Sequence, residues 1–502
     1  MKHIHTGLMT VVEVGINTHQ EPLVYMHKDC HVCVAEGFTA ASRVQVTQED
    51  RSLIATLNVV GNGFLAPGQI GLSDIAKHQL GVQAGDKVKV THAPVVNSLA
   101  AVRKKVHGNT LSEFEMGEIL KDISQHRYRD IEISSFLSVC AGGRLNPDEI
   151  IGLTRAMVAC GKTLDWPGCP RIFDKHCIGG VPGNRTTPLV VSIVSAAGHM
   201  IPKTSSRAIT SPAGTADTME ALMNVELTLG EMRRVVTDTG GCLVWGGAVN
   251  LSPADDLLIL IERALDLDGD GQLIASVLSK KIAAGSTHVV IDIPVGETAK
   301  VRTLSAANYL AAMFADVGEA CGIHVRCVIT DGSRPVGTGI GPVQEAHDLL
   351  GVLRCDPQAP ADLRQRALAL AANVLDMAEN QGMSEAMAKA TYILESGAAW
   401  EQFQRIAVAQ GGLKALSQAR FSATERATRR GRLQSIDNRK LARLAKLAGA
   451  PRQPVAGLRL HCNVGDTLDR DDEIFTLYSN SEGEGDYAME YYRQNRDMFI
   501  FE

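Results

Sequence analysis

The sequence lacks the features of a membrane, secreted or nucleic-acid-binding protein. No window approaches the ~18 consecutive apolar residues of a membrane span, and residues 1–5 lack the apolar stretch of a secretory signal. Aromatic residues make up 4% of the chain, and no basic stripe carries interleaved aromatics. We therefore expect a cytoplasmic protein with no membrane contact and no nucleic-acid partner.

The sequence also lacks a disulfide framework and a strong charge of either sign. Its eleven cysteines are scattered and odd in number, which is typical of reduced thiols in a cytosolic enzyme. The 50 basic and 56 acidic residues leave a net charge of −6. A length of 502 residues predicts roughly two to four domains with ample apolar cores.

Changes of residue pattern along the chain predict an α/β multidomain protein. Short apolar runs alternate with polar residues up to Pro94 and then give way to helical patterns, with capping boxes expected at Thr110 and Asn146. After residue 170, strands alternate with helices, as in a mostly parallel sheet. The predicted parts are a small β domain over 1–93, a helical domain over 95–165 joined by part of 250–270, an α/β substrate domain over 166–420, and an α+β domain over 431–502.

Two loops rich in glycine and hydroxyl groups follow short predicted strands in the α/β domain. The first spans 174–187 and the second 205–217, and each precedes a predicted helix. Small residues let an anion approach the backbone N–H groups at a helix start, and Lys175 and Arg207 can neutralise its charge. Both loops therefore predict phosphate binding, although many such loops in α/β proteins hold no ligand. Neither has the Walker or the dinucleotide glycine pattern.

An acidic segment, Asp266 to Asp270, begins like a calcium loop. Its twelfth position is Val277 instead of a bidentate glutamate, so calcium is not favoured. Three carboxylates this close repel one another, which favours a raised pKa and an acid role for one of them, with Asp268 as the candidate. The alternative is a solvated acidic turn.

Histidine and cysteine residues raise two further questions. His27, Cys30, His31 and Cys33 resemble a metal knuckle, but no second pair follows, so we predict ordinary strand residues and no metal. His176 lies inside the first loop and is a catalytic candidate. Its neighbour Cys177 lacks a hydrolase signature, and we expect it to pack or to contact phosphate weakly.

Three motifs carry a resemblance to a known family. They are Asp174-Lys175-His176-x-x-Gly179-Gly180, Ser205-Ser206-Arg207 with Gly214-Thr215-x-Asp217-x-x-Glu220, and Ala275-Ser276-x-Leu278-x-Lys280-Lys281. With these motifs, the chain resembles the thymidine and pyrimidine nucleoside phosphorylase family from about residue 95 onward. The N-terminal β domain is similar to that of the AMP-phosphorylase-like branch.

The resemblance implies a fold, a reaction and a set of site residues. Phosphate bound to the α/β domain attacks C1′ of a pentose, and the base departs, with inorganic phosphate as co-substrate and no other cofactor or metal. We also expect a homodimer or a larger homo-oligomer. The implied phosphate contacts are Lys175, Gly180, Ser205 and Thr215. The implied substrate contacts are Ser206, Arg207, Ala208, Ile209, Thr210, Ser211, Arg263, Ser276 and Lys300, and the catalytic candidates are Asp268, His176 and Lys280.

Four functions stay open at this point. Thymidine is the first expected substrate, and AMP or another nucleoside 5′-monophosphate is the alternative, because the 206–211 segment offers donors for a second phosphate. An anthranilate-type phosphoribosyltransferase would use magnesium and a Gly-Thr-Gly-Gly-Asp loop, which is missing. A non-catalytic nucleotide-binding protein is disfavoured by Lys175, Ser276, Lys280 and Asp268 occurring together.

Overall fold

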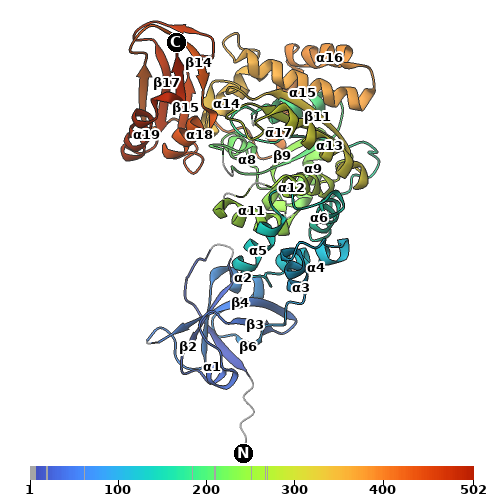
Figure 1. The fold of residues 1–502 in the computed structure, drawn as a ribbon, viewed down its shortest axis with the longest axis vertical. Coiled ribbons are helices and arrows are strands. Elements are labelled where there is room, and N and C mark those ends of the chain that lie inside the picture. Colours follow the sequence, from blue (N-terminus) through green and yellow to red (C-terminus); the bar gives the residue numbers. More distant parts are fainter. Residues whose placement is uncertain are drawn as a thin grey trace, which may run out of the picture. The chain divides into compact units, whose positions relative to one another are not determined.

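The computed structural model describes residues 7–18, 21–61, 63–183, 185–208, 211–249, 251–265, 267 and 269–502. This part of the chain divides into two compact units, one up to Val139 and one from Cys140 onward. Figure 1 labels their helices and strands along a colour scale that runs from blue to red. Among the described residues, every helix is too short or too polar to cross a bilayer.

Six strands of the first unit form a closed barrel in the order β1-β5-β2-β4-β3-β6. The barrel closes because β1 pairs in parallel with β5 and antiparallel with β6. Along β3, Val44 and Val46 point into the interior and are fully buried, as the alternating pattern predicts. The predicted β domain is thus a small barrel. Its strands are β1 (Leu8–Val12), β2 (Leu23–His27), β3 (Arg43–Gln48), β4 (Arg51–Val60), β5 (Gln69–Leu72) and β6 (Lys87–His92).

Short helices flank these strands, and longer ones follow them. The helix α4 begins with a capping box made by Ser112 and Glu115. The prediction of a box at Thr110 was wrong by two residues, because the hydroxyl of Ser112, and not that of Thr110, accepts from the first turn. The helices are α1 (His31–Glu36), α2 (Asp74–Leu80), α3 (Leu99–Val106), α4 (Glu113–Ser124) and α5 (Asp130–Cys140).

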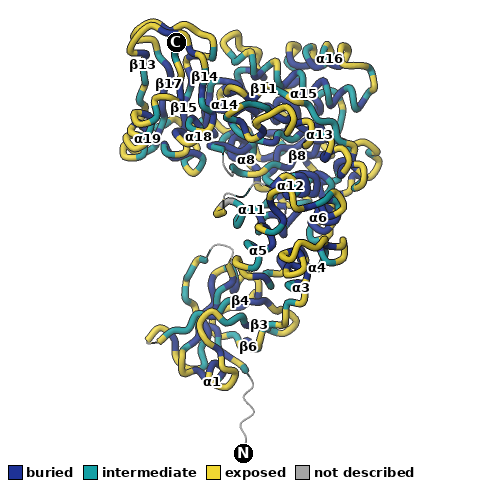
Figure 2. The backbone as a smooth tube through the Cα atoms, viewed as in Figure 1, coloured by how far each residue is buried: buried dark blue, intermediate teal, exposed yellow. Residues whose placement is uncertain are grey.

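The central α/β part of the second unit contains only parallel strand pairs in its described residues. β10 (His288–Val295) lies between β7 (Phe173–Cys177) and β11 (His324–Asp331), and β8 (Ile201–Ser205) pairs with β9 (Gly241–Trp245). The two groups meet where the Phe173 N–H donates to the Met200 carbonyl over 2.9 Å. Strand β8 is buried through Thr204 (Figure 2). The predicted mostly parallel sheet is confirmed.

Helices cover both groups of strands. α7 (Thr186–Ala196) is buried along nearly its whole length because its side chains are mostly apolar or hydroxyl-bearing, and it packs with α15 and α17 in the largest core. The other helices are α6 (Pro147–Ala159), α8 (Thr215–Glu220), α9 (Leu229–Thr239), α10 (Gly246–Val249), α11 (Pro253–Leu265), α12 (Asp270–Ala283), α13 (Leu304–Ala320), α14 (Pro342–Leu353), α15 (Ala361–Glu379), α16 (Met383–Glu395) and α17 (Ala398–Ala409).

The C-terminal part is an α+β structure built on two antiparallel sheets. The order of the first sheet is β12-β15-β17-β13, and that of the second is β16-β14-β18. In Figure 1, β14, β15 and β17 gather with α18 and α19. The elements are β12 (Gly339–Ile340), β13 (Phe421–Arg426), β14 (Gly431–Ile436), α18 (Asn438–Leu447), β15 (Gly457–Leu460), β16 (Thr467–Leu468), β17 (Glu473–Ser479), α19 (Glu482–Gln494), a 3₁₀ turn (Arg496–Met498) and β18 (Phe499–Phe501).

Two strands of these sheets precede residue 431, which is the predicted start of the C-terminal domain. β13 pairs with β17, and the short β12, which precedes α14, pairs with β15. Val181 of the first glycine loop also belongs to the C-terminal hydrophobic cluster. The C-terminal sheets are therefore continuous with the α/β part, and the domain boundaries expected from sequence stay predictions.

Candidate active site

The first glycine loop joins β7 to α7. Gly179 and Gly180 have φ values of +123° and +83°, a region that favours glycine. The Ile178 N–H donates to the Asp292 carbonyl over 2.9 Å, which ties the start of the loop to β10. The loop thus lies between a strand and a helix, as predicted, and α7 begins at Thr186.

The first loop contains a fully buried cation, Lys175. Its side chain is fully buried, and its Nζ donates to Thr186 Oγ1 at 2.6 Å and to Thr187 Oγ1 at 3.4 Å. Of the described carboxylates, none forms an ion pair with it. Burying an ammonium group without a counter-charge is costly, so an anion beside it would complete the charge balance.

A second group of buried charges lies on the neighbouring residue of β7. Asp174 accepts a hydrogen bond from Lys203 of β8 at 3.1 Å and forms an ion pair with Lys281 of α12 at 2.9 Å. Burial works to raise the pKa of Asp174, but the two ammonium groups outweigh it and hold the pKa below its usual range. Burial also lowers the pKa of Lys281 to about 7, against the pull of Asp174. These pairs fix β7 against β8 and α12.

His176 follows at the end of β7. Burial holds the pKa of its imidazole well below the usual range, and nearby lysines push it further down, with Lys281 the strongest and Lys280 among them. The ring is therefore neutral at pH 7, able to donate from one nitrogen and accept at the other. A neutral histidine among lysines is suited to orienting an anion or relaying a proton.

Cys177, the next residue, has no catalytic role. Burial and the Asp292 carboxylate raise the pKa of its thiol to about 12, so it is not a nucleophile. A Cβ on Gly183 would lie 2.4 Å from Cys177 Sγ and 3.2 Å from Asp292 Oδ2, so the loop packs tightly over this pair. The part of the expectation that assigned packing to Cys177 is confirmed.

The second loop begins where β8 ends. Ser205 Oγ is buried and has no hydrogen-bond partner in the described structure. Thr215 opens α8, and a Cβ on the preceding Gly214 would lie 2.6 Å from the Ser206 carbonyl oxygen. The two ends of the loop are therefore in close contact, and they lie next to β7, the strand that contains Lys175.

Arg207, in contrast to Lys175, forms ion pairs with three carboxylates. It pairs with both carboxylate oxygens of Glu220, with Glu226 at 3.0 Å and with Asp217 at 3.5 Å, and it stacks over Trp245. The hydrogen bonds from Arg207 to Glu220 raise the pKa of the guanidinium above its usual value. Arg207 thus fastens the loop to α8.

The other residues of this loop form local contacts. The Ala208 N–H donates to Asp217 Oδ2 at 2.6 Å, and the Ser211 hydroxyl donates to the Ala213 carbonyl at 2.9 Å. Ile209 and Thr210 lie outside the described residues.

The predicted base-side residues gather on α12 and α11. Lys280 Nζ lies 2.5 Å from Asp255 Oδ2 and donates to Ser276 Oγ at 3.3 Å. Burial alone would lower the pKa of Lys280, but Asp255 and Asp256 outweigh it and raise the pKa. Burial raises the pKa of Asp256 to about 6, although Lys280 opposes the change. The structure therefore brings Ser276 and Lys280 together, near His176.

Three further predicted residues have other outcomes. Asp268 and its neighbour Asp266 lie outside the described residues, and the side chain of Arg263 is not described, although α11 contains its backbone. Lys300 is exposed in the turn after β10, next to Ala299, whose carbonyl accepts from Arg439 of α18. Their proposed roles stay predictions.

Metal binding finds no support among the residues that the structure describes, where no group of three histidine, cysteine or acidic side chains could hold an ion. Cys30 is the N-cap of the short helix α1, and Cys33 lies within it. Cys33 is helical, and Cys30 lies between β2 and the helix, so the prediction of ordinary strand residues was wrong for both of them.

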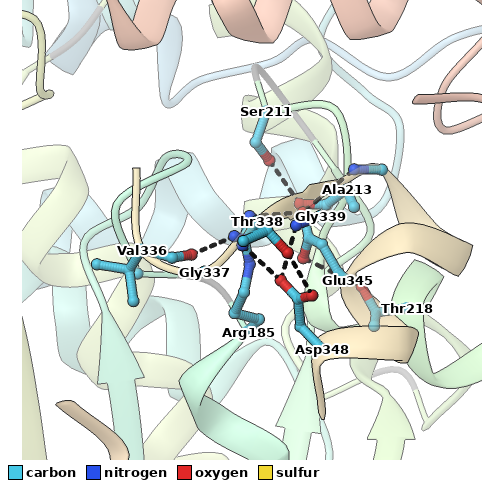
Figure 3. Close-up of polar contacts among 12 residues, drawn as sticks. Arg185, Ser211, Ala213, Thr218, Val336, Gly337, Thr338, Gly339, Glu345 and Asp348 are labelled. Carbon is cyan, nitrogen blue, oxygen red and sulfur yellow. Dashed lines mark hydrogen bonds and ion pairs between the residues drawn. The ribbon is translucent and has the colours of Figure 1, made fainter. Parts of the chain in front are cut away.

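Sequence reasoning missed Arg185, the residue that anchors the first loop to α14. It is almost fully buried, donates to the Val336 carbonyl, and pairs with Glu345 at 3.3 Å (Figure 3). Asp348 receives the N–H groups of Thr338 and Gly339 beside it, at 2.7 Å each (Figure 3). An arginine after a glycine loop suggests a ligand contact, and only the fold shows that its partner is a carboxylate 160 residues later.

Lys203, Lys281, Asp255 and Asp256 were also missed as members of the site. The available signal was positional, because Lys203 lies within a predicted buried strand and Lys281 adjoins Lys280 within a motif. A charged residue in either place needs a partner.

Similarity to known proteins covers almost the whole chain. The chain is 53% identical to "Putative thymidine phosphorylase 2" of Acidovorax sp. strain JS42 over 97% of its own length and 94% of the relative's. It is 52% identical to "Putative thymidine phosphorylase" of Legionella pneumophila strain Philadelphia 1, with the same shares covered. The chain belongs to the thymidine and pyrimidine nucleoside phosphorylase family. It is therefore an enzyme of the pentosyltransferase class.

Family descriptions match three segments of this phosphorylase-family chain. They are "Glycosyl transferase family, helical bundle domain" over 99–161, "Glycosyl transferase family, a/b domain" over 169–400, and "Pyrimidine nucleoside phosphorylase C-terminal domain" over 432–498. The a/b segment contains Lys175, Ser205 and Lys280, and the multidomain α/β fold is confirmed.

Solved structures of another enzyme class share the fold. Anthranilate phosphoribosyltransferase from Thermus thermophilus matches with a TM-score of 0.53 and 19% identity, over 62% of this chain and 99% of its own. The Saccharomyces cerevisiae enzyme, in complex with PRPP and Mg, matches with a TM-score of 0.51 and 15% identity, over 63% and 98%. At such identity the likeness concerns the fold alone.

Proposed function

We propose that this enzyme cleaves the N-glycosidic bond of thymidine with inorganic phosphate, giving thymine and 2-deoxyribose 1-phosphate. The observation that carries the proposal is the buried Lys175 ammonium, which among the described residues donates only to hydroxyl groups and pairs with no carboxylate. The identity to thymidine phosphorylase relatives supports the nucleoside as the second reactant.

Phosphate binds between the two loops in this proposal. Lys175 supplies the charge, Ser205 Oγ supplies a buried donor that has no described partner, and Gly180 and Thr215 line the site. An oxygen of the phosphate attacks C1′ while the C1′–N bond breaks, and the electron pair of that bond leaves with the base. Holding the phosphate in line removes much of the entropic cost of the attack.

The departing base needs compensation for its developing negative charge. Ser276 and Lys280 lie on α12 near His176, and with Arg263 we assign them to the base. Lys280 keeps its charge at neutral pH because Asp255 pairs with it. A proton reaches the base from a neighbouring acid, for which Asp268 is the candidate. No metal or other cofactor takes part in this scheme.

The second loop favours a nucleoside over a nucleoside 5′-monophosphate. A second phosphate near the 206–211 segment would need a free cation, but three carboxylates already surround Arg207. Bringing another anion there would cost electrostatic free energy unless those pairs opened. Lys300 remains a candidate contact for the pentose side of the substrate.

Release of free base from a panel of thymidine, uridine, cytidine, adenosine, AMP, CMP and UMP, with and without phosphate, tests the proposal. Phosphate-dependent release of thymine from thymidine, with no release from AMP, is the expected result. Adenine release from AMP but not from adenosine would instead make the 206–211 segment a 5′-phosphate site. Release without phosphate, or from no substrate, would overturn phosphorolysis.

A further inference from the structure

Two cysteines at the start of α1 are arranged as a pair. Cys30 is the N-cap residue, and its Sγ accepts the Cys33 backbone N–H at 3.0 Å, a role that serine or aspartate usually has. Both residues are buried in the core of the barrel, with exposed fractions of 0% and 4%. The cap places the Cys30 sulfur over the first turn, on the side of Cys33.

The two thiols also interact with each other. A hydrogen bond from the Cys33 thiol lowers the pKa of Cys30 to about 7, and the same contact raises the pKa of Cys33 above its usual value. The pair thus shares one proton more readily than two isolated thiols would. Elsewhere in the chain, burial raises the pKa of Cys327 and of Cys462 to about 12.

We propose that Cys30 and Cys33 form a reversible disulfide when the protein meets hydrogen peroxide. The Cys30 sulfur caps the helix 3.0 Å from the Cys33 backbone nitrogen, so the two side chains start from the same turn, where an S–S bond of about 2.05 Å can join them. Burial keeps bulky disulfides from exchanging with the pair, which favours a small peroxide as oxidant. The site is independent of the phosphorolysis proposed above.

The chemistry balances in two steps. The Cys30 thiolate attacks one peroxide oxygen, the O–O bond breaks, and Cys30 becomes a sulfenic acid with release of hydroxide. The Cys33 sulfur then attacks the Cys30 sulfur, and the displaced hydroxide takes the Cys33 proton and leaves as water. In sum, two thiols and one hydrogen peroxide give one disulfide and two waters, and a dithiol such as dithiothreitol reverses the change.

Peroxide titration of the full chain, followed by alkylation and peptide mass spectrometry, tests the site. We expect the peptide that contains both cysteines to lose two hydrogens at least tenfold faster than the exposed Cys355 becomes oxidised, and dithiothreitol to restore it. A pair that is still alkylated at both sulfurs when Cys355 has reacted would overturn the proposal. So would direct conversion of Cys30 to sulfinic acid.

Two variants separate the steps. Cys30→Ser keeps a capping oxygen and hence the helix start, and should leave Cys33 as an unreacted thiol. Cys33→Ser should stop at a Cys30 sulfenic acid that dimedone traps. Cys355→Ser is the matched control and should react at the pair as the unmodified chain does. Equal oxidation of Cys33 in the Cys30→Ser variant would contradict the assigned order of attack.

Discussion

The two glycine-containing loops have the same plan in sequence but different charge balance in the structure. In the first loop, Lys175 is buried against hydroxyl groups and has no described carboxylate partner. In the second, Arg207 is bound by Glu220, Glu226 and Asp217. Lys280 resembles Arg207 in this respect, since Asp255 pairs with it.

We interpret this difference as one between a cation available to the proposed phosphate and a cation that stabilises the fold. A paired charge already has its electrostatic stabilisation, and a new anion must compete with the partner. An unpaired buried charge gains from any anion that reaches it. We therefore expect the number of carboxylates around a cation to indicate phosphate binding better than the number of glycines beside it.

The largest effect is expected from Lys175→Met, which removes the buried charge and roughly keeps the side-chain volume. Catalytic efficiency should fall about 10³-fold, or ~4 kcal/mol, as for loss of a preorganised electrostatic contact. Because the buried charge is also lost, the melting temperature should stay equal or rise. Steady-state kinetics and thermal melts with and without phosphate check this.

Lys175→Arg is the control for that variant, because it keeps the charge with a different shape. It should retain more activity than the methionine variant and keep the stabilisation by added phosphate, which Lys175→Met should lose. A methionine variant that is still stabilised by phosphate would break the comparison between the loops.

Asp256→Asn should affect stability in a pH-dependent way. The pKa of Asp256 is raised to about 6 in the folded state, so the unfolded chain loses this proton first, and stability falls as pH rises from about 4 to about 6. The variant lacks this loss and should be more stable by about 2–3 kcal/mol at pH 7. Urea unfolding at pH 5 to 8 checks this, and an equal gain at both ends of that range would contradict the assignment.

Ser205→Ala should weaken phosphate binding and little else. Loss of one buried hydroxyl donor is worth ~1.4 kcal/mol, so the KM for phosphate should rise about tenfold with kcat nearly unchanged. Ser206→Ala, on the neighbouring residue, is the control and should leave the phosphate KM within about twofold. An increase confined to the nucleoside KM would place Ser205 elsewhere in the site.

Arg207→Gln should have the smallest effect on turnover. Its ion pairs are partly exposed, so stability should fall by about 1 kcal/mol, and the thymidine activity should stay within about threefold. Trp245→Leu removes the stacking partner while keeping the ion pairs and is a suitable control. A large loss of activity on a nucleotide substrate alone would show that Arg207 exchanges its carboxylates for a phosphate.

Local features of the fold were predictable because neighbours in sequence determine them. Asn146, Pro147 and Glu149 begin α6 as expected, and Thr228 with Glu231 begins α9, because a capping box needs only four residues. The strand and helix around Lys175 follow from the switch between apolar and glycine-rich residues. The acidic helix α19 was missed because Glu482 to Gln494 has few apolar residues.

Distant partnerships were not predictable in the same way. The pairing of Asp174 with Lys203 and Lys281 depends on how β7, β8 and α12 meet, and no local pattern contains that information. For the same reason, Arg207 was expected to be free for a ligand, because its contacts with Glu220 at the end of α8 and with Glu226 after that helix form only in the fold.

The closure of the N-terminal barrel limits how this unit can associate. Because β1 pairs with both β5 and β6, the described strands form a continuous ring, and the backbone hydrogen-bonding groups of an open edge are not available to another chain. Any partner has to recognise side chains such as Val34, which is 70% exposed on α1. Contacts of that kind can be strengthened or removed one residue at a time, so assembly through this unit can change during evolution without any rearrangement of the strands.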